Sequence, residues 1–344
     1  MVDLQYSFWR KIKQLRMPGC VTLLSPENVK WMTGLDTGMI LITEEDVKYV
    51  VPKLELERAR ERTPWVEVKE GPRRALWKVI EQECKPPYFA DLKYLNFSLA
   101  NSLIVELGAG DISKRVEEMR RSKDDYEIER MRESLRIAEE AFKDSWEELE
   151  EGVEEREAAG ILEMHMRERG SQEYAFPSIV AFGESSAHPH YVPGRNKFSR
   201  DHIALFDFGA VLDGYRSDIT RSYAPEKSPF RDWMMAVLEA VNESIKMIKA
   251  GVKAKDVDAK AREVLKEYGL EEAFIHGLGH GVGVEVHEPP YLSQSSSHVL
   301  MEGDVVTIEP GVYFPKVGGI RVEQMVLVKK GGYEVLNKLP AVWW

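Results

Sequence analysis

The chain after about residue 125 alternates between helix-like and strand-like patterns of apolar positions. Apolar side chains from Ile128 to Leu149 recur every three or four residues, which predicts one long amphipathic helix with a charged, solvated face. Three further helices are predicted, each followed by a glycine that suits a left-handed C-terminal cap, and Asp256 is expected to cap the last. They span 154–169, 231–250 and 256–268. Four β-rich segments are predicted at 202–211, 215–224, 304–314 and 321–329.

The first part of the chain has shorter apolar runs interrupted by prolines. Strands are predicted at Cys20–Leu24, Met39–Thr43 and Val47–Val51, within a smaller α/β domain. The composition becomes rich in Glu, Arg and Lys near Met119–Lys123. The sequence therefore predicts an α+β protein with two domains, at residues 1–120 and 121–344.

The overall charge and the cysteine content narrow the possible classes of protein. A net charge of −11 over 344 residues argues against a nucleic acid or an anionic membrane as partner. The two cysteines, Cys20 and Cys84, exclude a thiolate metal cluster, and we expect both to be buried small apolar residues without a disulfide. No signal peptide and no run of about 18 apolar residues is present, so a cytoplasmic protein is expected.

A hairpin in the second domain is predicted to bring two aspartates together. Asp213-Gly214 is a strong signal for a two-residue turn, which pairs Asp207 with Thr220. Asp207 and Asp218 are then offset by two positions and share one face of the sheet. Because Asp207 lies between two phenylalanines in an apolar strand, its carboxylate needs a cation to offset the cost of burial.

Two glutamates near the C-terminus are also predicted to share one face of a pair of strands. Glu309 and Glu323 lie on strands that are joined through Pro315–Gly319, and a loop centred on Lys316 places them opposite each other on one face. His280 lies among four alternating glycines, which permit close backbone approach. A phosphate cradle is the other interpretation of these glycines, but no helix signal follows them.

Each of these residues alone has an ordinary structural explanation, such as a salt bridge or a hydrogen-bonded core histidine. Together, four carboxylates and one imidazole at compatible positions indicate a two-metal hydrolytic site. The predicted ligands are Asp207, Asp218, His280, Glu309 and Glu323. Such a set suits Mn²⁺, Co²⁺, Fe²⁺ or Zn²⁺, and the sequence does not choose among them.

Four segments in the second domain resemble, in order, the metal-site motifs of the pita-bread metallopeptidases. They are DFGAVLDGYRSDITR, HGLGHGVGVEVHE, TIEPGVYF and GGIRVEQMVLV. This family includes methionine aminopeptidase, Xaa-Pro aminopeptidase, prolidase and creatinase. The segment SPENVKWMTGL resembles the N-terminal creatinase-type domain more loosely. The resemblance implies a pita-bread catalytic domain behind a creatinase-like α/β domain, and the length and layout are most similar to a short prolidase.

The resemblance also implies roles for individual residues. Asp218 and Glu323 would bridge two divalent ions, and Asp207 would complete the protein ligands of one ion. His280 and Glu309 would complete those of the other. Outside this set, His190 and His287 would bind the substrate and stabilise negative charge, and Arg321 would orient Glu323 as an outer partner. His188 is expected to be a solvated loop histidine, while His276 and His298 carry no assigned role.

The implied reaction is hydrolysis of Xaa-Pro dipeptides. A hydroxide shared by the two ions would attack the carbonyl before proline, and Glu309 would carry its proton to the leaving nitrogen. An Xaa-Pro aminopeptidase acting on longer peptides is the main alternative. A non-catalytic peptide-binding module and a creatinase-like hydrolase are the other two. Relatives with this N-terminal domain are commonly homodimers, and the Trp343-Trp344 tail is expected to pack on the domain surface or on a partner subunit.

Overall fold

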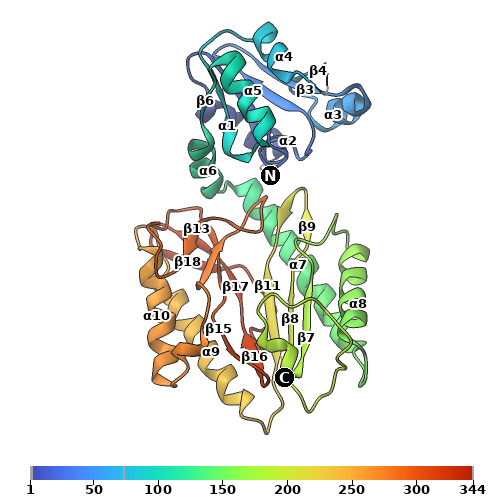
Figure 1. Ribbon diagram of the computed structural model, residues 1–344, viewed down its shortest axis with the longest axis vertical. Coiled ribbons are helices and arrows are strands. Elements are labelled where there is room, and N and C mark those ends of the chain that lie inside the picture. Colours follow the sequence, from blue (N-terminus) through green and yellow to red (C-terminus); the bar gives the residue numbers. More distant parts are fainter. Residues whose placement is uncertain (1–2, 73, 343–344) are drawn as a thin grey trace. The chain divides into compact units, whose positions relative to one another are not determined.

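The computed structural model describes residues 3–72 and 74–342, which form two compact units (Figure 1). The first unit extends to Arg120 and includes residues 124–126, while the second includes 121–123 and continues from Glu127. Helices α6 (Ser113–Arg121) and α7 (Asp125–Glu147) carry the chain from one unit to the other. The two C-terminal tryptophans lie outside the described residues, so their expected packing stays a prediction.

The first unit is built on a six-stranded mixed sheet in the order β4-β3-β2-β1-β5-β6. Strand β2 pairs antiparallel with β1 and β3, whereas β3–β4, β1–β5 and β5–β6 are parallel pairs. The strands are β1 Cys20–Leu23, β2 Met39–Ile42, β3 Val47–Val51, β4 Glu67–Glu70, β5 Tyr88–Ala90 and β6 Gly110–Asp111. The helices are α1 Leu4–Leu15, α2 Pro26–Thr33, α3 Leu56–Arg62, α4 Leu76–Glu83 and α5 Phe97–Leu107, with single 3₁₀ turns η1 Lys53–Glu55 and η2 Leu92–Tyr94. All three strands predicted here are confirmed, β1 and β2 one residue shorter than expected.

The cysteines of this unit differ from the expectation. Both are buried, as predicted, but Cys20 and Cys84 are joined in a disulfide, with their Cα atoms 5.8 Å apart. Cys20 begins β1 and Cys84 ends α4, and both side chains belong to the same apolar core. The expectation of free thiols was wrong because 64 residues separate the pair, and only the packing of α4 brings them within bonding distance.

The second unit contains two main antiparallel sheets, β11-β8-β7 and β13-β12-β14-β17-β18, and two short hairpins, β10-β9 and β15-β16. The first six strands are β7 Ile179–Phe182, β8 Ala204–Phe208, β9 Val211–Leu212, β10 Tyr215–Arg216, β11 Ile219–Tyr223 and β12 Gly279–Gly281. The others are β13 Glu288–Leu292, β14 Val305–Ile308, β15 Gly311–Phe314, β16 Gly318–Arg321, β17 Gln324–Lys329 and β18 Gly332–Val335. The helices are α8 Glu155–Glu168, α9 Phe230–Lys246 and α10 Ala254–Glu267, with 3₁₀ turns η3 Gly183–Ala187 and η4 Glu271–Ala273.

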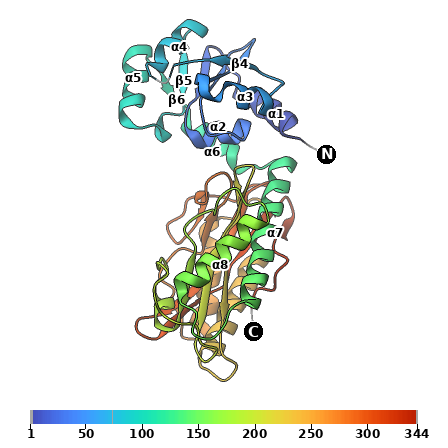
Figure 2. The same ribbon diagram turned by 90° about the vertical axis from the view of Figure 1, so that its right-hand side faces the viewer.

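Two pairs of helices enclose these sheets (Figures 1 and 2). Helices α9 and α10 pack with strands β14, β16 and β17 in one continuous apolar core. On the other side, Phe142 of α7 stacks on Phe208 of β8 with ring centroids 5.3 Å apart, and α8 packs beside β7. The strands that carry the candidate ligands therefore lie between two helical layers. Among the described residues, no helix is long and apolar enough to cross a membrane.

The four helices predicted for this unit are present, with differences at their ends. Helix α7 ends at Glu147, and α9 ends at Lys246 rather than at residue 250. Asp256 lies inside the first turn of α10, whose N-cap is Lys253. Each predicted β-rich segment contains two short strands or parts of them, because two residues interrupt the strand in each segment, as Glu309 and Pro310 do between β14 and β15.

The first predicted hairpin has the expected register. Asp213 and Gly214 both adopt positive φ angles, 50° and 86°, as a two-residue hairpin turn requires. Leu212 pairs with Tyr215 beside the turn, and Asp207 pairs with Thr220 farther along. The same pairing holds from the turn to the end of β8, so Asp207 and Asp218 lie on one face.

The second predicted hairpin is also centred on Lys316, which has a φ of 64°. Gly311 pairs with Arg321 in the inner ladder, and β14 and β17 continue in the same register. Glu309 and Glu323 fall between these two ladders at matching positions. The predicted loop was too long, because residues 318 and 319 already belong to β16.

Gly209 is the point where the two strands of the aspartate hairpin approach most closely, and its replacement tests this geometry. A Cβ atom at this position would lie 1.9 Å from the carbonyl oxygen of Ser217, which belongs to the backbone and has little room to move. We expect Gly209→Ala to lower the free energy of unfolding by about 2–3 kcal/mol, as overpacking of a core does. Urea denaturation of the purified variant measures this change.

Gly160→Ala is the matched control. Gly160 lies within α8, and a Cβ atom there would meet nothing within 4 Å. Alanine should leave the stability unchanged or raise it by up to about 1 kcal/mol. Equal stability of the two variants would contradict the close approach at Gly209.

Candidate metal centre

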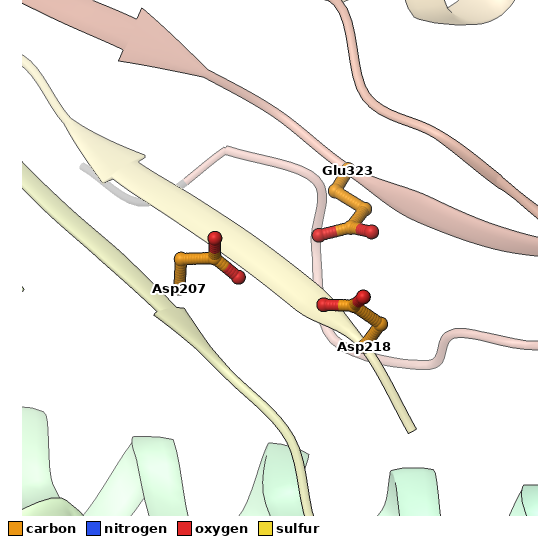
Figure 3. A group of neighbouring side chains, drawn as sticks. All are labelled: Asp207, Asp218 and Glu323. Carbon is orange, nitrogen blue, oxygen red and sulfur yellow. The ribbon is translucent and has the colours of Figure 1, made fainter. Parts of the chain in front are cut away.

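Three buried carboxylates meet at one point in the second unit. Asp207 comes from β8, Asp218 precedes β11, and Glu323 precedes β17. One oxygen atom from each lies within 4.8 Å of the others, and the three side chains point toward one another (Figure 3). At this spacing a single cation can contact all three carboxylates.

His280 and Glu309 lie directly beside this group. The Nε2 atom of His280 is 3.2 Å from Oε1 of Glu309 and 3.6 Å from Oδ2 of Asp218. Its Nδ1 atom lies 3.1 Å from the carbonyl oxygen of Gly281, so a proton on Nδ1 leaves the Nε2 lone pair facing the carboxylates. The structure thus brings together all five residues that the sequence analysis selects as ligands.

Burial makes this cluster electrostatically unfavourable without cations. It raises the pKa of Asp218 well above its usual range, and the charges of Glu323 and Asp207 add to that shift. The pKa of Glu323 is raised well above its usual range for the same reasons, with Glu309 contributing the largest charge effect. Burial also raises the pKa of Asp207, although the charge of Arg321 opposes it. Carboxylates in this state must hold protons or bind cations.

Glu309 and His280 behave differently from the other three. Burial acts to raise the pKa of Glu309, but the hydrogen bond to His280 and the nearby positive charges together outweigh burial and lower that pKa to about 2. Burial acts to lower the pKa of His280, but the same hydrogen bond and the negative charge of Glu309, with smaller contributions from other groups, raise it. These two side chains form a charged pair in the absence of a metal, and a bound cation would replace the proton between them.

The donor set fits divalent metal ions. Oδ1 of Asp207 and Oε1 of Glu323 are buried and have no hydrogen-bond partner. Buried polar atoms in native proteins normally find a partner, and an ion is one explanation for such an exception. Four carboxylates and one imidazole supply the oxygen-rich mixed ligands that first-row divalent ions accept.

Arg321 does not have the direct partner that we expected. Its Nη2 atom is 2.6 Å from Oδ2 of Asp207. Arg321 reaches Glu323 indirectly, through the hydroxyl of Thr220. The Nε atom of Arg321 donates to the Thr220 hydroxyl at 3.1 Å, and that hydroxyl donates to Oε2 of Glu323 at 2.9 Å. The expected partner was wrong because adjacent strands place the guanidinium over β8, and spacing along one strand does not reveal this.

Two threonines that the sequence analysis did not select orient the acidic side chains. In addition to Thr220, Thr307 donates its hydroxyl to Oε1 of Glu309 at 3.0 Å and accepts the backbone N–H of His280 at 3.0 Å. The positions of the two threonines in the sequence could have identified them. Thr307 is two residues before Glu309, and Thr220 is the predicted cross-strand partner of Asp207.

Asp207, Asp218 and Glu309, together with His280, line a cavity of about 650 Å³. His190 and His287 line this cavity, as expected for substrate-binding residues, and the ring of His287 lies 4.3 Å from that of His280. Burial, together with the charge of His280, lowers the pKa of His287 to about 4, so its imidazole is neutral at pH 7. Apolar residues such as Phe176 and Ile179 form part of the same wall.

His276, which had no assigned role, also lines the cavity. Its Nε2 atom is 2.9 Å from the hydroxyl oxygen of Tyr313, which in turn accepts a hydrogen bond of 2.7 Å from Arg321. A continuous set of contacts therefore joins His276 to Asp207. His188, by contrast, is exposed, and its ring stacks beside Tyr191.

Comparison with known proteins agrees with this geometry. Residues 129–330 match the model of metallopeptidase family M24. The Xaa-Pro dipeptidase of Pyrococcus furiosus is 36% identical over 327 residues, which cover 92% of this chain and 93% of the relative.

Solved structures also share the complete arrangement. The prolidase from Pyrococcus furiosus superimposes with a TM-score of 0.85 at 34% identity, covering 94% of this chain and 97% of that one. The X-Pro aminopeptidase from Thermotoga maritima gives a TM-score of 0.89 at 31% identity, covering 97% and 99%. The expected fold, a pita-bread domain that follows a creatinase-like domain along the chain, is thus confirmed. The chain belongs to metallopeptidase family M24.

Proposed function

We propose that this metallopeptidase is an Xaa-Pro dipeptidase that uses two divalent metal ions. The observation that carries the proposal is the convergence of Asp207, Asp218 and Glu323 beside His280 and Glu309, at the base of a cavity. A volume of about 650 Å³ is within the usual range for small-ligand sites and suits a dipeptide. The Pyrococcus relatives that carry the name Xaa-Pro dipeptidase support this substrate class.

The five side chains would divide between the two ions. Asp218 and Glu323, whose pKa values are raised well above their usual range, would help to hold both ions, since two positive charges offset their repulsion best. Asp207 would complete one ion's ligands while Arg321 holds its Oδ2 atom. His280 and Glu309, which already contact each other, would complete the other's. The ions are Mn²⁺, Co²⁺, Fe²⁺ or Zn²⁺.

When bound, the ions would activate a water molecule for attack on the peptide carbonyl. Glu309, with a pKa lowered to about 2, is ionised at neutral pH and would accept a proton and pass it to the leaving nitrogen. His287 is neutral, so one ring N–H would donate to a substrate oxygen without adding a full charge. His190, which also lines the cavity, would help to hold the substrate.

Proline at the scissile bond would be favoured by shape. Its nitrogen carries no hydrogen, and its ring fixes the chain direction, so a peptidase for this bond needs no acceptor at that nitrogen and gains from an apolar wall. Phe176, Pro177 and Ile179 supply such a wall. An Xaa-Pro aminopeptidase that acts on longer peptides remains the second candidate, favoured by the similarity to the Thermotoga maritima enzyme.

We also propose that the chain forms a homodimer and that its domains are residues 1–120 and 121–344. The resemblance to two-domain relatives supports the dimer. Helix α5 exposes Phe97, Ile104 and Val105, which are apolar side chains that a subunit interface would cover. Sedimentation should give a mass near twice that of one chain, and a monomer at micromolar concentration would contradict the dimer.

The substrate proposal predicts release of free proline. The metal-loaded protein should hydrolyse Leu-Pro and Met-Pro, while Leu-Ala should react at least about tenfold more slowly because it lacks the ring that the apolar wall contacts. Proline release from Leu-Pro with Mn²⁺, Co²⁺ or Zn²⁺ measures this. Release only from tripeptides or longer substrates would establish the aminopeptidase instead.

The ligand assignment predicts a joint loss of metal and activity. Asp207→Asn and Glu323→Gln each remove a charge that the cations need, so kcat/KM should fall by more than about 100-fold and bound metal should decrease in parallel. Metal analysis and the proline assay on the same samples measure both. Asp201→Asn, an exposed aspartate nearby, is the matched control and should behave as the wild type. Wild-type turnover by either ligand variant would refute the assignment.

The raised pKa values predict that metal stabilises the fold more as pH rises. In the metal-free fold, Asp218 and Glu323 hold protons that the unfolded chain releases near pH 4, so their contribution is present below that pH. This stabilising contribution is lost as pH rises toward the pKa values that the two carboxyl groups have in the folded protein. Bound metal, by contrast, requires both groups to be deprotonated. The difference in Tm between Mn²⁺-loaded and chelator-treated protein should therefore widen from pH 5.5 to 8. A constant or shrinking difference in calorimetry would contradict this.

A further inference from the structure

Glu155 is a buried carboxylate that the proposed chemistry does not use. It lies in the first turn of α8, and its side chain is inaccessible to solvent. Five groups donate to its two oxygens, and all five are neutral. Phe182 N donates to Oε1 at 2.8 Å, as do the hydroxyl of Ser185 and, at 3.3 Å, the amide of Asn196. The hydroxyl of Tyr191 and the N–H of Gly194 donate to Oε2, each at 2.9 Å.

These donors hold both ends of one loop. Residues 183–196 connect β7 to the segment before β8, and the part between Pro189 and Val192 forms a wall of the catalytic cavity. Phe182 ends β7 and Ser185 lies near the start of the loop, whereas Tyr191 lies within the cavity wall and Gly194 follows it. A single carboxylate therefore closes the loop, because it bonds to Phe182 and Ser185 and also to Gly194, which lies nine or more residues farther along the chain.

The loop is also fixed from the side of the metal centre. Gly319 N donates to the hydroxyl of Ser186 at 2.9 Å, and Nη2 of Arg321 approaches the carbonyl oxygen of Pro189 at 3.5 Å. Between these contacts and Glu155, the cavity wall has few hydrogen bonds of its own, and His190 is exposed within it. The carboxylate therefore supports the His190 and Tyr191 side chains from behind, together with the backbone bonds that Glu155 N and Arg156 N donate to the carbonyl oxygens of Asn196 and Gly194.

We propose that Glu155 is a positioning residue, which sets the geometry of the substrate-contacting wall at His190–Val192 through Tyr191 and Gly194. The inference rests on the proposed peptidase function of the cavity. A carboxylate suits this task because both of its oxygens accept, and each oxygen has one donor that is a backbone N–H and cannot accept in return. An ionised acceptor also makes stronger hydrogen bonds than a neutral one.

Glu155→Gln tests the proposal with the smallest change in shape. The amide has one oxygen and one NH₂ group, so whichever way it turns, its NH₂ group faces a backbone N–H at Phe182 or Gly194. We expect kcat/KM for Leu-Pro to fall about tenfold, the amount that loss of one hydrogen bond to a charged group predicts. Bound metal should stay at the wild-type level, since Glu155 contacts none of the five candidate ligands.

The loop itself supplies a readout that needs no substrate. Arg195 and Lys197 are exposed near its end, so trypsin cleavage at these two sites, measured by mass spectrometry, reports on its anchoring. We expect faster cleavage there in Glu155→Gln. Glu157→Gln is the matched control, because Glu157 lies on the same turn and is exposed. Its side chain accepts the backbone N–H of Glu154, a role that glutamine also fills.

Tyr191→Phe separates positioning from a general effect on stability. It removes one hydroxyl from the Glu155 contact and keeps the ring in the wall. If Glu155 acts through Tyr191, the effects of the two substitutions on kcat/KM should be less than additive in the double variant. If Glu155→Gln does not fold, Tyr191→Phe should still lower kcat/KM and speed cleavage at Arg195.

The outcomes distinguish this proposal from the proposed function. Wild-type kcat/KM and wild-type cleavage in Glu155→Gln would overturn the positioning role, as would additive effects in the double variant. No proline release by the metal-loaded wild type would refute the dipeptidase assignment alone, and the cleavage measurement would still decide whether Glu155 anchors the loop.

Discussion

Mutual repulsion among buried carboxylates is the constraint on which the second unit depends. Asp207, Asp218 and Glu323 approach within 4.8 Å in a buried setting, where charges of one sign interact strongly. Such a cluster stays assembled only if the backbone that carries it cannot relax. The two hairpins, the threonine hydroxyls and the helical layers on both sides supply that rigidity, and they leave cations as the means of offsetting the charge.

Two arginine side chains that support the carboxylate cluster are themselves buried and charged. Arg221 is fully buried, and burial lowers its pKa to about 10, which still leaves it charged at neutral pH. It donates to the carbonyl oxygens of Glu323 at 2.7 Å and Leu339 at 3.0 Å, so it ties a candidate ligand to the end of the chain. Arg321 also holds a candidate ligand, because it donates a hydrogen bond to the side chain of Asp207. Each guanidinium supplies positive charge near the carboxylates without occupying the space between them.

The sequence predicted what depends on local periodicity and missed what depends on packing between segments. The Asp213-Gly214 turn and the pairing about Lys316 follow from turn chemistry and the two-residue period of strands, so the convergence of the acidic residues was predictable. The partner of Arg321 and the Cys20–Cys84 disulfide were not, because each contact joins elements whose relative placement no spacing encodes. Glu155 gave no signal either, since its sequence neighbours are ordinary helix-surface residues.

The two kinds of functional group in this site have different mechanical requirements. The candidate metal ligands must resist repulsion, and they lie on or beside paired strands whose ladders fix the backbone. Under the proposed function, the wall at His190–Val192 must instead accommodate a substrate, and it lies in a loop with no ladder. A loop of this kind keeps a defined position only if its backbone donors find acceptors elsewhere. A buried carboxylate on a neighbouring helix meets that need with a single side chain, which is the role that we propose for Glu155.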